Sequence, residues 1–114
     1  MSSWNRGNLF EGIPADLPEE WLQTMWADGR TRIERIVSRG HRSEAGFWYD
    51  QEWDEWVVVI KGAAELVFAG CAAPVAMGPG DWVRIPARTK HRVSWTDPDQ
   101  ETVWLAIHMM PSVQ

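Results

Sequence analysis

From residue 31 onward, hydrophobic side chains recur at about every second position, which is the period of a β-strand. Turns that contain Gly, Pro or Asp interrupt this pattern at short intervals. The pattern predicts strands at residues 31–38, 47–60, 64–68, 75–77, 82–85, 92–96 and 102–109. Many short strands joined by tight turns are typical of an all-β sandwich or barrel.

The segment before residue 30 has a different period. Its apolar residues recur at helical spacing and are followed by Gly29: Trp21, Leu22, Met25 and Trp26. Glu19 and Glu20 precede them, and carboxylates near the start of a helix interact favourably with the positive end of the helix dipole. The spacing predicts one short amphipathic helix packed on the outside of the barrel. We therefore expect residues 1–30 to form an N-terminal segment with this helix, and residues 31–114 to form the barrel domain.

Composition narrows the possible functions. The chain has 114 residues, enough for one domain with a single core. Its net charge of -5 argues against nucleic-acid binding, because such proteins present a basic surface. No apolar run approaches the roughly 20 residues of a membrane span, and a single cysteine, Cys71, fits a reducing cytoplasm. We expect a cytoplasmic protein that binds neither nucleic acid nor membrane.

One face of the predicted strand 47–60 carries a single charge. Side chains alternate between the faces of a strand, so the odd-numbered residues lie together: Phe47, Tyr49, Gln51, Trp53, Glu55, Val57 and Val59. Glu55 then points into the barrel, where a lone carboxylate needs a cation, a hydrogen-bond donor or a proton. His91 follows a proline-containing loop at the start of a strand and is the expected neighbour of Glu55.

These residues belong to two stretches with distinctive spacing. The first contains Tyr49, Gln51, Glu55 and Gly62, and the second contains Gly80, Pro86, Arg88, His91 and Trp95. Together the stretches resemble the two signature motifs of the cupin family, G-x5-H-x-H-x3,4-E-x6-G and G-x5-P-x-G-x2-H-x3-N. Tyr49 and Gln51 stand in place of the two histidines of the first motif. Arg88 and Trp95 replace the inner Gly and the Asn of the second.

The resemblance implies an RmlC-like jelly-roll β-barrel, usually a homodimer joined through sheet edges. It implies that Gln51, Glu55 and His91 hold a divalent transition metal (Fe, Mn, Ni, Zn or Cu), with Tyr49 as a fourth ligand or an acid. It also implies a pocket for a small organic ligand, lined by Phe47, Tyr49, Trp53, Val57, Val93 and Trp95, with Arg88 at its mouth. The candidate catalytic residues are Tyr49, Glu55 and His91.

Three functions stay open from the sequence. The first is a metal-binding protein or enzyme that acts on a small organic molecule. The second is a metal-free module that holds an apolar or aromatic ligand, because nine tryptophans are available to line the barrel. The third is a metal-independent, isomerase-like acid/base catalyst that uses Glu55 and His91. The same polar groups would also suit a purely structural network.

Two further histidines have no assigned role. His41 is expected in an exposed loop, and a loop folded over the mouth would bring it in as a substitute ligand. His108 is expected on the last strand, either packed or near the site.

Overall fold

The computed structural model describes residues 4–111, which form eight β-strands and no helix. The strands are β1 (Trp21–Ala27), β2 (Thr31–Ser38), β3 (Asp54–Lys61), β4 (Ala64–Phe68), β5 (Val75–Met77), β6 (Trp82–Ile85), β7 (His91–Thr96) and β8 (Thr102–Met109). The all-β fold predicted from the sequence is confirmed. Strands β2, β4, β5, β6 and β8 have the predicted bounds, and β7 begins one residue earlier.

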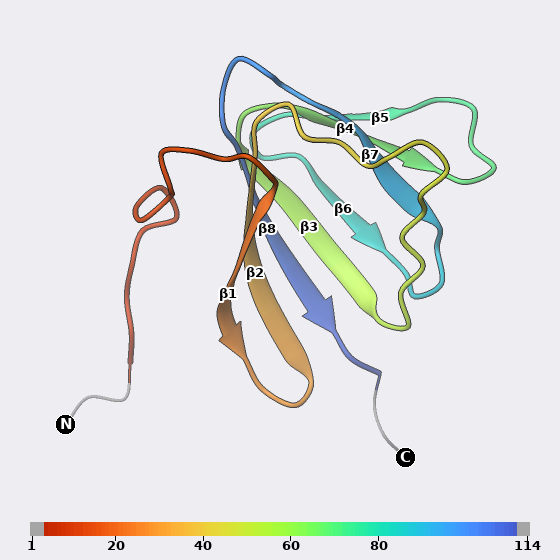
Figure 1. Ribbon diagram of the computed structural model, residues 1–114. Coiled ribbons are helices and arrows are strands. Elements are labelled where there is room, and N and C mark those ends of the chain that lie inside the picture. The colour runs from red at the N-terminus through yellow and green to blue at the C-terminus, as the bar shows by residue number, and fades with distance from the viewer. Residues whose placement is uncertain (1–3, 112–114) are drawn as a thin grey trace.

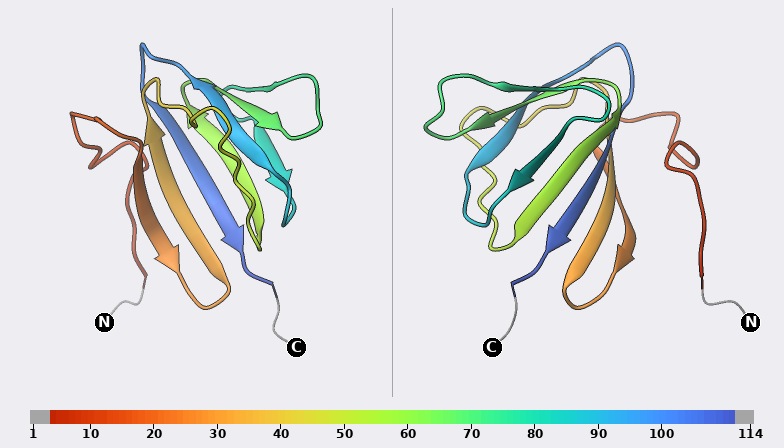
Figure 2. Two further views of the ribbon diagram at one scale, coloured as in Figure 1. Left: turned by 45° about the vertical axis from the view of Figure 1, so that its right-hand side comes forward. Right: turned by 180° about the vertical axis from the view of Figure 1, so that it is seen from behind.

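The strands form two antiparallel sheets (Figure 1). The larger sheet has the order β1-β2-β8-β3-β6, and the smaller has the order β5-β4-β7. The smaller sheet lies over β3 and β6, whereas β1 and β2 extend beyond it (Figure 2). Strand β8 inserts between β2 and β3, so one wall contains strands from both ends of the chain. This arrangement is the expected jelly roll.

The core lies between the two sheets and draws on alternate residues of β3, β4 and β8 and on one residue each of β5 and β6. Its buried members are Val57, Val59, Ala64, Leu66, Met77, Ile85, Trp104 and Ala106. Full burial of one such large apolar side chain contributes about 1.5–3 kcal/mol. Contacts among these side chains hold the two sheets together.

The predicted N-terminal helix is wrong. Trp21–Ala27 form β1, which pairs with β2 at the edge of the larger sheet. A tight turn joins the two strands, in which Asp28 Oδ1 accepts the backbone N–H groups of Arg30 and Thr31, each at 2.7 Å. The turn places this segment beside β2, whose free backbone groups then bond to it. Asp28-Gly29 between apolar segments is a hairpin signal, and it outweighs the helical spacing.

Only the second half of the predicted strand 47–60 is regular, because β3 begins at Asp54. The preceding residues cross between the sheets. Tyr49 forms a backbone bridge with His91 of the smaller sheet, with N···O distances of 2.7 and 3.1 Å, whereas Glu55 pairs within the larger sheet. A segment that changes sheets cannot stay in one ladder, so strict alternation of the side chains is lost before residue 54.

Strand β1 leaves an open edge on the larger sheet. Three of its apolar side chains are exposed: Leu22, Met25 and Trp26. An open edge with apolar side chains favours pairing with another chain. A homodimer stays a prediction, and β1 is the edge that would suit it.

Gly62 has a conformation that other residues rarely adopt. Its φ is +93°, and an added Cβ would lie 2.6 Å from Thr102 Cα and 2.7 Å from the Glu101 carbonyl oxygen. Both neighbours are backbone atoms at the start of β8 and cannot move aside. We expect Gly62→Ala to lower the free energy of unfolding by about 2–4 kcal/mol, from backbone strain and steric overlap together. Urea denaturation measures this change.

Gly70→Ala is the matched control. Gly70 has a φ of +82°, but nothing lies within 4 Å of an added Cβ. This variant introduces backbone strain alone, and the expected loss is about 1–2 kcal/mol. Equal losses in the two variants would show that the approach of Gly62 to β8 does not limit stability.

Candidate functional site

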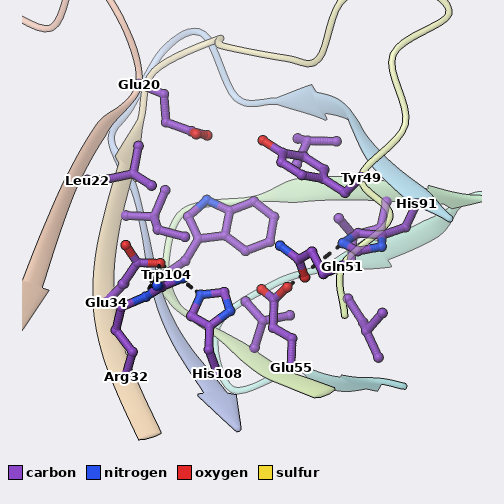
Figure 3. Close-up of a pocket in the computed structure, with 15 residues that line it drawn as sticks. Glu20, Leu22, Arg32, Glu34, Tyr49, Gln51, Glu55, His91, Trp104 and His108 are labelled. Carbon is purple, nitrogen blue, oxygen red and sulfur yellow. Dashed lines mark ion pairs between the residues drawn. The ribbon is translucent and has the colours of Figure 1, made fainter. Parts of the chain in front are cut away.

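A cavity of about 260 Å³ lies between the two sheets (Figure 3). Both sheets and the crossover segment contribute to it, and its lining mixes titratable and apolar side chains. The lining residues are Glu20, Leu22, Arg32, Glu34, Ile36, Tyr49, Gln51, Glu55, Val57, Leu66, Ile85, His91, Val93, Trp104 and His108.

The larger sheet places three polar side chains in one row. Its register puts Arg32 of β2 opposite His108 of β8, and His108 opposite Glu55 of β3. Opposed side chains on one face of an antiparallel sheet have Cβ atoms about 4.5–5.5 Å apart. The row ends at apolar Ile85 of β6, which is opposite Glu55. A guanidinium, an imidazole and a carboxyl are thus neighbours although they are distant in the sequence.

Six of the predicted site residues line this cavity: Tyr49, Gln51, Glu55, Val57, His91 and Val93. They come from the crossover segment, from β3 and from β7 in the opposite sheet. In Figure 3 the side chains of Gln51, Glu55 and His91 point into the same part of the cavity. The fold therefore brings together residues that the two sequence stretches hold apart.

Trp95, a predicted pocket residue, does not line the cavity. The ladder between β4 and β7 has an irregularity, because Glu65 is opposite Trp95 whereas Leu66 is opposite Val93. Ser94 is the extra residue, and a bulge of this kind reverses the alternation of side chains beyond it. Val93 therefore faces the cavity, and Trp95 is 42% exposed.

Phe47 and Trp53 also lie outside the cavity lining, because the crossover segment does not alternate as a strand does. Phe47 lines a neighbouring depression together with His41. The indole of Trp53 lies behind the cavity wall, where its Nε1–H donates to His108 Nδ1 at 2.7 Å. Trp53 thus acts on a cavity residue without reaching the cavity itself.

Arg88 lies outside the lining as well, at the position where the second motif has a glycine. Its φ of +62° is the left-handed conformation that glycine favours, so the backbone keeps the shape of the motif. The guanidinium lies 2.9 Å from Glu52 and 3.6 Å from Asp50, and the backbone N–H donates to the Gln51 carbonyl oxygen at 2.7 Å. Arg88 therefore fastens the crossover segment that presents Gln51.

His91 offers an unprotonated nitrogen to the cavity. Its Nδ1 is 2.8 Å from the carbonyl oxygen of Thr89. A carbonyl only accepts hydrogen bonds, so the proton of the neutral ring resides on Nδ1 and the Nε2 lone pair is free. Burial lowers the pKa of His91, which favours the neutral form, and the bond to Thr89 opposes this effect. The Tyr49 ring stacks on the imidazole, with a centroid distance of 5.4 Å.

Glu55 holds its proton unusually tightly. Burial, and then the nearby Glu34 carboxylate, raise the pKa of Glu55 from 4.5 to about 7, although Arg32 opposes this shift. Its Oε1 is 3.9 Å from His91 Nε2, which is too far for a hydrogen bond. The opposite pKa shifts of the two groups favour a neutral carboxyl beside a neutral imidazole. Their contact is therefore not a salt bridge near neutral pH.

A second polar group surrounds His108. Because Trp53 donates to Nδ1, the neutral ring carries its proton on Nε2, which is 2.8 Å from Glu34 Oε1. The N–H is not aligned with that oxygen, so the contact is electrostatic rather than a good hydrogen bond. Burial lowers the pKa of His108, with Glu34 opposing. Arg32 Nε is 3.6 Å from the same Glu34 oxygen.

Several lining residues belong to no distinctive sequence pattern, among them Glu20, Arg32, Glu34 and Trp104. Alternation along β2 places Arg32, Glu34 and Ile36 on one face, but Arg35 on the other face is also charged and buried. Charge alone therefore does not show which face is inward. The pairing of β2 with β8 would have shown it, since β8 carries His108.

Residues 37–108 match the family described as Cupin domain. The chain belongs to the cupin family. A candidate mannose-6-phosphate isomerase from Ralstonia eutropha JMP134 is 46% identical, with a TM-score of 0.90 over 94% of this chain and 99% of that one. No curated protein matches the chain.

More distant cupins share the fold. A cupin superfamily protein from Desulfitobacterium hafniense DCB-2 is 16% identical, with a TM-score of 0.71 over 87% of this chain and 84% of that one. The polyketide cyclase RemF from Streptomyces resistomycificus is 21% identical, with a TM-score of 0.69 over 82% and 67% of the two chains. At these identities the likeness concerns the fold alone. Within residues 4–111 there is no helix that is long and apolar enough to cross a membrane.

The metal site implied by the cupin motifs does not fit the donor atoms of this chain. Residues 4–111 contain no group of three or more His, Cys, Asp or Glu side chains placed to hold a metal ion. His91 Nε2 is a free imidazole donor, but His108 Nδ1 is occupied by Trp53. Glu55 favours its proton, which competes with a metal, and Gln51 offers a neutral amide.

Proposed function

We propose that this cupin transfers protons, without a metal, on a small hydroxy-carbonyl compound, as in an aldose–ketose isomerisation. The observation that carries the proposal is the position of Glu55 and His91, which face one cavity from opposite sheets, 3.9 Å apart. A protonated carboxyl beside an unprotonated imidazole is an acid and a base that are ready at the same pH. The name of the 46% identical Ralstonia protein supports the same class of reaction.

In the proposed reaction His91 is the base and Glu55 is the acid. His91 Nε2 accepts the proton of the carbon beside the carbonyl, while Glu55 donates its proton to the carbonyl oxygen, which gives an enediol. His91 then returns its proton to the former carbonyl carbon, and Glu55 accepts the proton of the other hydroxyl group. The carbonyl group has then moved to the neighbouring carbon. Both residues regain their starting protonation states, and no oxidant is needed.

Tyr49 and Gln51 have supporting roles in this proposal. Burial, with Glu20 and Glu55 nearby, raises the pKa of Tyr49, so its phenol stays neutral and donates hydrogen bonds. Its ring also holds the His91 imidazole by stacking. Gln51 supplies an uncharged amide beside the acid. Neither residue adds a charge that would shift Glu55 or His91 away from the neutral state.

Hydrogen exchange at carbon tests the proposal. The protein is incubated in D2O with a chelator and with a panel of aldoses and ketoses, and NMR follows deuterium at the carbon beside the carbonyl. Exchange faster than in buffer is expected, and it should be equal with and without the chelator. Exchange that requires added Fe, Mn, Ni, Zn or Cu would contradict the metal-free route. No exchange with any compound would contradict catalysis and favour the binding module.

A further inference from the structure

The cavity has a second polar end, away from His91, where Glu20 and Trp104 lie (Figure 3). Trp104 is 4% exposed, and its indole Nε1–H is buried without an acceptor among the described residues. In Figure 3 this nitrogen lies on the edge of the ring nearest Glu20. An unpaired buried donor is unfavourable, so this position favours a ligand atom that accepts a hydrogen bond.

Glu20 offers the complementary group. Ser38 Oγ donates to Glu20 Oε2 at 3.2 Å, which holds the carboxyl in place. Figure 3 shows this carboxyl pointing into the cavity above the indole of Trp104. A donor on Trp104 and an acceptor on Glu20 therefore lie on neighbouring parts of the wall.

The cavity lining is rich in carboxyl groups. It includes Glu20, Glu34 and Glu55, whereas Arg32 is the one Lys or Arg side chain among the lining residues. Burial raises the pKa of both Glu20 and Glu55, so these two groups resist a further negative charge beside them. The Arg32 guanidinium lies 3.6 Å from Glu34, which balances its charge although Arg32 Nε makes no hydrogen bond, and 5.5 Å from the centre of the Trp53 ring. A phosphate dianion in this cavity would lie among three carboxyl groups, and the one cation of the lining, Arg32, is already balanced by Glu34.

We infer that the ligand is an uncharged polyhydroxy compound, one hydroxyl of which bridges Trp104 and Glu20, and that sugar phosphates are disfavoured. A hydroxyl group accepts from the indole N–H and donates to the carboxylate at once. A phosphate dianion only accepts, and an ammonium group only donates. The inference rests on the proposed function, since it names the substrate class of the same cavity. It also separates this chain from the phosphorylated sugar in the name of its Ralstonia relative.

Paired sugars test the inference. NMR shift titration gives the dissociation constants of mannose, glucose and fructose and of their 6-phosphates. We expect at least one free hexose to bind about 10-fold more tightly than its 6-phosphate. Trp104→Phe keeps the ring but removes the N–H, and it should weaken hexose binding about 5- to 10-fold. Glu20→Gln removes a negative charge and should narrow the difference between each sugar and its 6-phosphate.

Trp82→Phe is the matched control, because Trp82 is exposed and does not line the cavity. It should leave all six constants unchanged. Circular dichroism reports whether Trp104→Phe folds. If this variant does not fold, the dissociation constants of the wild type and of Glu20→Gln test the inference. Equal or tighter binding of the 6-phosphates, or no binding of any free hexose, would overturn the inference. Hexose binding without deuterium exchange would keep the inference and reject the proposed function. Deuterium exchange with the 6-phosphates but with no free hexose would keep the proposed function and reject the inference.

Discussion

Glu55→Gln is expected to slow hydrogen exchange about 100- to 10,000-fold, which is the usual contribution of a positioned acid or base. Glutamine keeps the size and polarity of the side chain, but its amide has no acidic proton to transfer to the substrate. In the wild type, exchange should fall above about pH 7, where Glu55 ionises. The exchange rate should also fall at acid pH, where His91 becomes protonated. Burial lowers the pKa of His91 below the ordinary value of 6.5, so this fall should occur below about pH 6.5. Deuterium incorporation measured across pH checks both limbs.

Glu65→Gln on β4 is the matched control for this variant. The Glu65 carboxylate accepts a hydrogen bond from Ser94 Oγ at 2.9 Å and does not line the cavity. Its exchange rate should equal that of the wild type. If Glu55→Gln retains exchange within a few-fold of the wild type, Glu55 is not the acid.

Glu55 should also make stability depend on pH, with a span of about 3 kcal/mol. The folded state raises its pKa from 4.5 to about 7, and each pKa unit corresponds to about 1.36 kcal/mol. Between these values the folded protein binds more protons than the unfolded chain, so stability falls as pH rises. The contribution is fully present below about pH 4.5 and lost above about pH 7. Glu55→Gln lacks this dependence and should gain stability relative to the wild type as pH rises.

The difference between the two proteins isolates Glu55. The lowered pKa values of His91 and His108 act in the opposite direction, since stability from a neutral buried imidazole is lost as pH falls. Both proteins share the effect of these histidines, so it cancels in the difference between their free energies of unfolding. Urea denaturation of wild type and Glu55→Gln at several pH values gives the difference directly. A difference that stays flat from acid to alkaline pH would show that Glu55 titrates normally.

The strand pattern was predictable where local signals agree. Residues of β2, β4, β5, β6 and β8 alternate and are bounded by turns, so periodicity alone gave their limits. It failed at β1, where four apolar residues also fit a helix and the outcome depends on pairing with β2. It failed again at residues 47–53, because a change of sheet leaves no periodic signal.

The candidate site was predictable only where spacing is distinctive. Glu55 and His91 keep positions of the cupin motifs, and the fold brings them to one cavity. Glu34, His108 and Trp104 belong to no motif, and their positions follow from β2 pairing with β8 about seventy residues later. Trp95 was misplaced because one extra residue, Ser94, reverses a strand face. Long-range register and bulges are properties of the assembled sheets.

Tyr49 and Gln51 reach the cavity from a crossover held by main-chain bonds to His91 and Arg88. Such bonds do not depend on which side chain the crossover carries. Mutations at these two positions can therefore accumulate without weakening either sheet. In evolutionary terms, the barrel can exchange one set of cavity groups for another while its folding is left intact. A lineage of such proteins would diverge in chemistry faster than in shape.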